Sequence, residues 1–229
     1  MAETLQVEDL KKLPFFADLD EDGLHRLLEK HRIVEIPPGH TLVMESDWGE
    51  NLMVLLTGLA KVRSFNADGD ESILSLVGEG DLLGEISALD GEPRSADVVS
   101  LTPVKLLKMD GRTFQSLLRT HPSLALQLAR LEAGRLRDLN RRFALQRSDA
   151  TTRVLDALAY IARKSSASDD PLTLMPDLPQ GEIAIIAGMA RETSSRTMSK
   201  LRSKGVVIEQ TGGMKLSSIE PLKKRGLIA

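Results

Sequence analysis

One stretch of thirteen residues, GEISALDGEPRSA at 84–96, brings together the side chains needed to bind a small anionic ligand. Gly84 permits the backbone to approach a ligand closely, and Arg94 supplies a guanidinium fork for a phosphate, with a hydroxyl beside it on Ser95. Glu85 suits a sugar hydroxyl, and the residues after it can begin a short helix whose free N–H groups suit a phosphate. These residues fit a ligand with one phosphate and one ribose, and they equally fit a loop held by a Glu–Arg salt bridge.

A second pattern, near the C-terminus, favours DNA recognition. Two short helices are expected at about 179–187 and 191–203, with Gly188 closing the first of them. The second begins with Arg191, Glu192 and, one turn on, Arg196, which share a face. Arginine can grip guanine O6 and N7, and glutamate can accept from the cytosine amine. An exposed, salt-bridged helix face is the alternative, but the turn and the Gly-Gly hairpin that follows favour a helix-turn-helix.

The charge distribution agrees with a division of the chain into two functions. The whole chain has a net charge of −3, yet residues 149–229 hold 12 basic against 9 acidic side chains. Within 191–204 five basic side chains face one acidic one. An acidic first part joined to a part with a local basic stripe indicates a nucleic-acid contact in the second part.

Composition excludes several kinds of function. The chain of 229 residues has no cysteine, which excludes disulfides, iron–sulfur clusters and thiolate nucleophiles, and fits a reducing cytoplasm. No metalloprotease, Walker or nucleophile-elbow motif is present, so we expect neither an enzyme nor catalytic residues. The histidines are scattered without ligand spacing, and no metal site is predicted. They are His25, His31, His40 and His121.

No membrane segment is expected. The most apolar run, LMVLLTGLA at 52–60, has half the length that a spanning helix needs. The N-terminus is acidic and interrupted by charges, unlike a signal peptide. The sequence therefore predicts a cytoplasmic location.

Turn signals and hydrophobic spacing divide the chain into three regions. Short helices are expected over 13–34, and apolar runs alternating with turns at 35–110 predict an antiparallel β-roll. From Pro122 to about Ser148 the leucines recur at helical spacing, which predicts a helix of some 25 residues. A helix of this length needs a partner for its apolar face, and a second copy of the chain is the natural one. The expected dimerisation residues are Leu136, Leu139 and Phe143.

Taken together, these motifs make the chain resemble the Crp/Fnr family of bacterial transcription regulators, from about Leu13 to Leu216. Residues 84–96 are similar to the phosphate-binding cassette of cyclic-nucleotide domains, including the length between Glu85 and Arg94. The resemblance implies an α+β fold with three parts. These are an N-terminal cyclic-nucleotide-binding β-roll (1–121), a long dimerisation helix with a hinge (122–148) and a C-terminal winged helix-turn-helix that binds DNA (149–229).

The resemblance also implies roles at the ligand. Glu85 would bind the ribose 2′-hydroxyl, and Arg94 and Ser95 the cyclic phosphate, helped by Gly84 and the backbone of Ile86 and Ser87. Other expected ligand residues are Val62, Leu74, Ser75, Arg135 and Asn140. Cyclic AMP is the expected effector. Because Leu139 and Asn140 replace the family's base-contacting hydroxyls, cyclic GMP or a cyclic dinucleotide stays open.

At the DNA the resemblance assigns base reading to Arg191, Glu192 and Arg196, with TGTGA half-sites in a palindromic operator, and adds Gln180 as a DNA contact. Pro179 stands where a capping threonine is usual. Ser194 and Thr197 replace apolar residues beneath the recognition helix. Double-stranded DNA, a second copy of the chain and RNA polymerase are the expected partners. A ligand-independent regulator, and a cyclic-nucleotide-binding subunit acting on a protein, are the alternatives.

Overall fold

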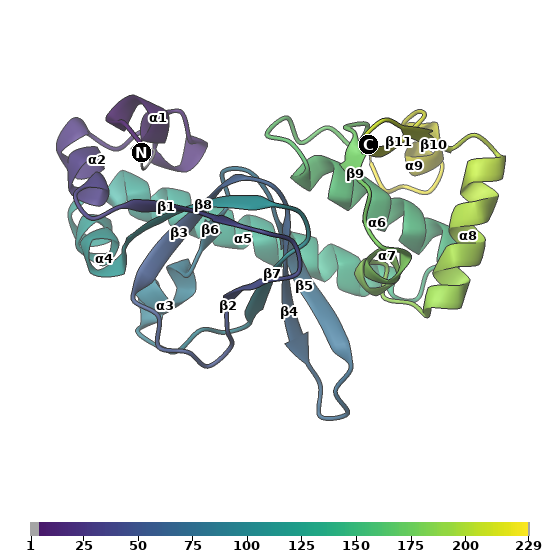
Figure 1. The fold of residues 1–229 in the computed structure, drawn as a ribbon, viewed down its shortest axis with the longest axis horizontal. Helices are drawn as coiled ribbons and strands as arrows, with labels where there is room; N and C mark the ends of the chain where they lie inside the picture. Colours follow the sequence, from purple (N-terminus) through teal and green to yellow (C-terminus); the bar gives the residue numbers. More distant parts are fainter. Residues whose placement is uncertain (1–4, 229) are drawn as a thin grey trace. The chain divides into compact units, whose positions relative to one another are not determined.

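The computed structural model describes residues 5–228, and their contacts divide the chain into two compact units (Figure 1). The first unit runs to Ala60 and resumes over Val77–Asp138. The second comprises Lys61–Leu76 and the chain from Leu139 onward. The functional boundaries after residues 121 and 148 remain predictions.

The first unit combines short helices with two antiparallel sheets. Its helices are α1 (Val7–Lys11), the 3-10 helix η1 (Pro14–Phe16), α2 (Glu21–Leu28), α3 (Glu85–Asp90), α4 (Gly111–Thr120) and the first part of α5 (Pro122–Leu145). Its strands are β1 (Arg32–Ile36), β2 (Thr41–Val43), β3 (Asn51–Thr57), β6 (Leu82–Leu83), β7 (Asp97–Ser100) and β8 (Val104–Asp110). One sheet has the order β1-β8-β3-β6, and in the other β2 pairs with β7. The predicted β-roll is confirmed.

The helical prediction over 13–34 is wrong at its C-terminal end. Helix α2 is capped by Asp20, whose carboxylate accepts the Gly23 N–H at 2.8 Å, and it ends at Leu28. The chain then enters β1, in which Arg32 lies opposite Lys108 of β8. Pairing with a strand some 70 residues away in the chain outweighs the local helical spacing.

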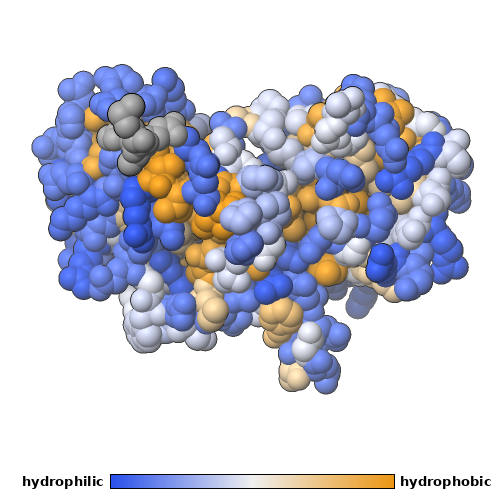
Figure 2. All heavy atoms as spheres, viewed as in Figure 1, coloured by the Kyte–Doolittle hydropathy of each residue, from blue (hydrophilic) through white to orange (hydrophobic). Residues whose placement is uncertain are grey.

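The hydrophobic core of the first unit lies between these helices and the sheet of β3 and β8. Phe16 and Phe114 are fully buried, and Phe15 packs edge-on against Phe16 with ring centroids 5.0 Å apart. Leu124 and Leu128 at the start of α5 complete the cluster. On the outer surface, hydrophobic side chains gather over β1 and β8 (Figure 2).

The second unit contains a hairpin from the first half of the sequence. Strands β4 (Ala60–Phe65) and β5 (Glu71–Val77) are joined by a turn in which the Asn66 carboxamide accepts the N–H groups of Asp68 and Asp70. The remaining elements are the end of α5, α6 (Ala150–Lys164), β9 (Met175–Pro176), α7 (Gln180–Ile186), α8 (Arg191–Ser203), β10 (Val207–Gln210), β11 (Gly213–Leu216) and α9 (Glu220–Lys223). The third sheet has the order β10-β11-β9, which confirms the expected hairpin after α8.

Polar contacts hold the β4–β5 hairpin in this unit. Lys61 is buried, and its Nζ lies 2.7 Å from carboxylate oxygens of Glu71 and of Glu182 on α7. The Leu76 N–H donates to the Tyr160 hydroxyl of α6 at 2.9 Å. These partners are 84 and 121 residues from the hairpin in the chain. No helix in the described residues is long and apolar enough to cross a membrane.

Candidate functional sites

Arg94 is the centre of the predicted phosphate site. Its side chain is only 6% exposed, and Nη2 donates to the Asn51 carbonyl at 2.6 Å. Two backbone hydrogen bonds hold the residue itself, because the Arg94 N–H donates to Asp47 and its carbonyl accepts from Ser46, both at 2.9 Å. The buried Nη1 has no hydrogen-bond partner among the described residues. The backbone therefore holds the Arg94 guanidinium in place, and its Nη1 is available to donate to a ligand.

Two glycines flank the guanidinium and make room for it. Gly84 has φ +84°, and a Cβ there would lie 2.1 Å from Arg94 Nη1. A Cβ on Gly49 would lie 2.6 Å from Nε. A Cβ at either position would force the Arg94 side chain to shift, and at Gly84 the positive φ and the Asn51 carbonyl, 2.7 Å from that Cβ, also favour glycine.

Glu85 supplies the second polar group. It is the first residue of α3 and is 4% exposed. Its Oε1 accepts from Arg135 Nη1, whereas the buried Oε2 has no hydrogen-bond partner in the described chain. Arg135 also donates from Nη2 to the Leu82 carbonyl at 2.6 Å and from Nη1 to Glu132 at 3.0 Å. The structure thus pairs the predicted ligand residues Glu85 and Arg135 directly.

Burial and nearby carboxylates have opposite effects on the pKa values of Arg94 and Arg135. Burial lowers the pKa of the Arg94 guanidinium, while the Glu85 carboxylate opposes that shift. Burial also acts to lower the pKa of Arg135, but Glu85, Glu132 and Asp81 outweigh it and raise that pKa. Both arginines are therefore cations held in a poorly hydrated place, where an anion or a carboxylate is stabilising.

The arrangement fits a ligand that carries both an anionic oxygen and a hydroxyl group. A phosphate oxygen would satisfy Arg94 Nη1, and a hydroxyl would satisfy Glu85 Oε2. α3 confirms the short helix expected after Glu85. Ile86 and Ser95 are exposed and Ser87 is half-buried, whereas Val62, Leu74, Ser75 and Asn140 belong to the second unit.

The sequence reasoning missed two residues of this cluster, Asn51 and Glu132. Glu132 had a usable signal, because it lies three residues before Arg135 on the same predicted helix face. Asn51 contributes only its backbone carbonyl, which no sequence pattern marks.

Helix α8 has the two faces that the DNA prediction requires. Arg191, Glu192 and Arg196 are exposed. Ser194 and Thr197 are on the buried face of the same helix, together with the apolar residues Met198 and Leu201. The Thr197 hydroxyl donates to the Thr193 carbonyl at 2.8 Å, but the Ser194 Oγ has no partner in the described residues. A buried hydroxyl without a partner costs about 1–3 kcal/mol, so this helix is held less firmly than an apolar contact would hold it.

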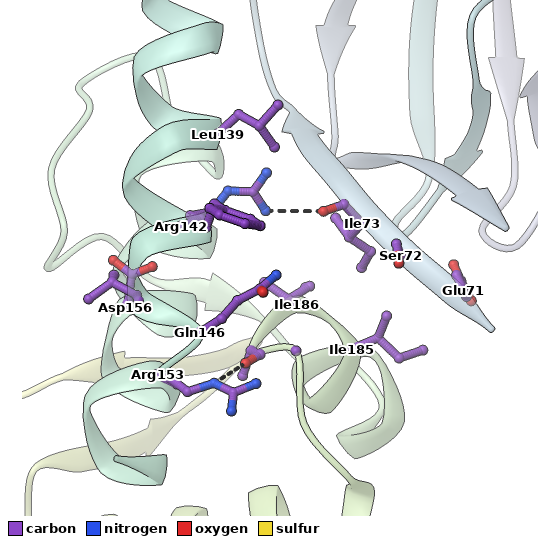
Figure 3. Close-up of a pocket in the computed structure, with 14 residues that line it drawn as sticks. Glu71, Ser72, Ile73, Leu139, Arg142, Gln146, Arg153, Asp156, Ile185 and Ile186 are labelled. Atoms are coloured by element: carbon purple, nitrogen blue, oxygen red, sulfur yellow. Dashed lines mark hydrogen bonds between the residues drawn. The ribbon is translucent and has the colours of Figure 1, made fainter. Parts of the chain in front are cut away.

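The turn between α7 and α8 is braced by α6. Gly188 has φ +62°, and Arg153 Nε donates to the adjacent Ala187 carbonyl at 3.0 Å. In Figure 3 Arg153 of α6 points at this turn at the lower end of a pocket, and above it Arg142 of α5 donates to the Ile73 carbonyl of β5. The Arg153 hydrogen bond thus links the turn between α7 and α8 to α6.

The start of α7 has no side-chain cap. Its N-cap residue is Pro179, which makes no capping hydrogen bond, as the sequence indicated. Gln180, the first helical residue, keeps its Oε1 buried and without a hydrogen-bond partner in the described chain. Among the described residues no group of three or more histidine, cysteine, aspartate or glutamate side chains is placed to hold a metal ion.

Known protein families match both the region of the Glu85–Arg94 site and the region of helix α8. A cyclic nucleotide-binding domain model matches residues 33–121, and a Crp-like helix-turn-helix domain model matches residues 152–225. A CRP-like cAMP-activated global transcriptional regulator of Mycobacterium tuberculosis is 29% identical over 220 residues, which cover 95% of this chain and 98% of the relative. The cyclic AMP receptor protein of Thermus thermophilus is 31% identical over 199 residues, covering 86% and 89%.

The fold has solved counterparts as well. The structure of FixK2 from Bradyrhizobium japonicum superposes with a TM-score of 0.74 over 85% of this chain and 96% of that one, at 18% identity. Fold and sites define a DNA-binding transcription regulator with a cyclic-nucleotide-binding domain. The chain belongs to the Crp/Fnr family, and its Mycobacterium tuberculosis relative is by name a global transcriptional regulator.

Proposed function

We propose that the chain is a homodimeric transcription factor that binds a palindromic operator when a cyclic nucleotide, most favourably cyclic AMP, occupies the first unit. One observation carries the ligand part of this proposal. The buried Glu85 Oε2 acceptor and the buried Arg94 Nη1 donor both lack partners among the described residues. Unsatisfied buried polar groups are costly, so a ligand that satisfies both is strongly favoured.

In this proposal the 2′-hydroxyl of the ribose donates to Glu85, and Arg94 with Ser95 binds the cyclic phosphate beside the backbone of α3. Gly84 lets that backbone approach. We further propose contacts to the base and sugar from Val62, Leu74, Ser75 and Asn140. Cyclic AMP is the first choice because two relatives carry it in their names.

The DNA part rests on the exposed face of α8. Arg191 and Arg196 would each bind a guanine of a TGTGA half-site, and Glu192 would accept from a cytosine amine. Gln180, the first residue of α7, would lie near the phosphates of the DNA backbone. Two-fold symmetry requires the half-sites to lie about 34–36 Å apart, one helical turn.

The dimer part rests on α5. Leu136, Leu139 and Phe143 are 58%, 41% and 71% exposed, although they are large and apolar and share a helix face. A second copy of the same helix would cover them. RNA polymerase is the further partner that a transcription regulator of this kind engages.

A titration of the full-length protein with cyclic AMP, cyclic GMP and cyclic di-GMP tests the proposal. Calorimetry measures binding, and a gel shift with a TGTGA palindrome measures DNA affinity in each condition. We expect cyclic AMP to bind and to strengthen the shift. A shift that is equally strong without any ligand would instead support a ligand-independent regulator. Ligand binding with no salt-sensitive DNA shift would support a regulatory subunit acting on a protein.

Replacing Arg191 by alanine should relax base preference at one guanine of the half-site and leave the other positions discriminating. The lost contact is worth about 1–3 kcal/mol against the wrong base. A binding selection from randomised operators measures this directly. An asymmetric selected motif, or one without guanine at the expected positions, would refute the roles given to Arg191, Glu192 and Arg196.

Lys200 provides the matched comparison, because it is exposed on the same helix one turn beyond Arg196. If it contacts phosphate, Lys200→Ala should weaken all sequences alike and reduce the slope of log affinity against log salt by about one. Base preference should stay unchanged in this variant.

A further inference from the structure

We propose that Glu132 is a positioning residue that weakens binding of an anionic ligand at the Glu85–Arg94 site and makes the affinity rise as the pH falls. This inference rests on the proposed function, since the ligand it concerns is the cyclic nucleotide. Glu132 lies on α5, outside the cassette of residues 84–96.

The geometry shows one arginine shared by two carboxylates. Arg135 Nη1 donates both to Glu85 Oε1 and to Glu132 Oε1, the latter at 3.0 Å. The Glu132 side chain is 33% exposed and the Glu85 side chain 5%. The two carboxylates are therefore close to one another, with a single guanidinium between them.

The charges of the cluster give the direction of the effect. Without ligand, the carboxylates of Glu85, Glu132 and Asp81 already outnumber the guanidiniums of Arg94 and Arg135 by one. A cyclic phosphate adds a further negative charge to this cluster. Neutralising Glu132 removes one of these negative charges and so lowers the repulsion that the ligand meets. Interactions across a few ångströms in a partly buried site are large enough to change affinity measurably.

Protonation of Glu132 supplies that neutral state. Burial raises the pKa of its carboxyl group, Arg135 opposes the shift, and Glu85 adds to it. The other charged groups around Arg135 are Glu85 on α3 and Asp81 before β6. A bound anion raises the pKa of Glu132 further, so binding takes up a proton. Affinity is then higher below the pKa of Glu132 and falls as the pH rises through it.

The test compares the full-length protein with Glu132→Gln, which keeps the size of the side chain and an acceptor for Arg135. At neutral pH we expect Glu132→Gln to bind cyclic AMP more tightly by several-fold, on the order of 3- to 10-fold. Calorimetry in buffers of different ionisation enthalpy, between about pH 5 and pH 7, should show proton uptake on binding in the wild type and less uptake in the variant. Uncharged adenosine should show no gain in affinity.

Two further variants separate charge from shape. Glu132→Asp keeps the charge and should restore the affinity and pH dependence of the wild type. Asp138→Asn removes the same charge from the same helix, at a side chain with no hydrogen bond or ion pair to Arg135 among the described residues, and should change neither. Equal cyclic AMP affinity and equal proton uptake in Glu132→Gln and wild type would overturn the inference while the proposed function stands. Failure of the wild type to bind any cyclic nucleotide would overturn the proposed function itself.

Discussion

Replacement of Arg94 by alanine is expected to weaken cyclic-nucleotide binding by about a hundredfold or more. Arg94 offers a buried, unpaired donor to the only negative charge of the ligand. Breaking a buried charge pair on one side costs about 3–5 kcal/mol, and each 1.4 kcal/mol is about tenfold in affinity. Calorimetry with cyclic AMP measures the loss. An unchanged affinity in a folded Arg94→Ala protein would overturn the assignment of the phosphate site.

The same variant should remain folded without ligand. Arg94 is a buried cation with one unsatisfied nitrogen, so its removal takes away a cost along with the Asn51 hydrogen bond. We expect Arg94→Ala to keep the melting temperature of the ligand-free protein and to lose the increase that the ligand causes in the wild type. Arg112→Ala is the control, because Arg112 is a 77% exposed arginine of the same unit that pairs with Glu50.

A double replacement of Leu136 and Phe143 by glutamate is expected to give monomers and to abolish operator binding. These side chains are 58% and 71% exposed on one face of α5. Charges on both copies would repel across the proposed helix pair, and a monomer holds only one half-site. Loss of the second half-site removes a gain on the order of 10²–10⁴ in affinity. Sedimentation and a gel shift on the palindrome measure the two effects.

Leu126 on the same helix supplies the control for this experiment. It is 52% exposed but lies on a different face of α5, so Leu126→Glu should leave a dimer that binds the operator. If the Leu136/Phe143 double variant sediments as a dimer, the apolar face of α5 has another role and the dimer lies elsewhere.

The sequence predicted best where function depends on residues close together in the chain. The short helix after Gly84, the two helices around Gly188 and the long helix from Pro122 each follow from local spacing and turn chemistry, and the structure confirms them. The predicted end of the helical region at residue 34 was wrong, because β1 already begins at Arg32 and pairs with β8, which is far along the chain.

Contacts between distant residues could not be predicted. The Arg135–Glu85 pair joins positions 50 residues apart, and Lys61 and Glu182 are separated by 121. Lysine in a strand normally indicates a solvent-exposed position, yet Lys61 is 3% exposed. Its two carboxylate partners make that burial tolerable, and neither follows from the residues around it.

The place of the β4–β5 hairpin has a consequence for dissecting the molecule. The chain passes from one unit to the other after Ala60, returns after Leu76 and crosses again after Asp138. A fragment that begins at Asp149 would therefore lack both strands, leaving Glu182 without Lys61 and the Tyr160 hydroxyl without the Leu76 N–H. No single cleavage separates the two halves as intact pieces. Gene fusions or domain exchanges with a relative must carry residues 61–76 together with the DNA-binding half.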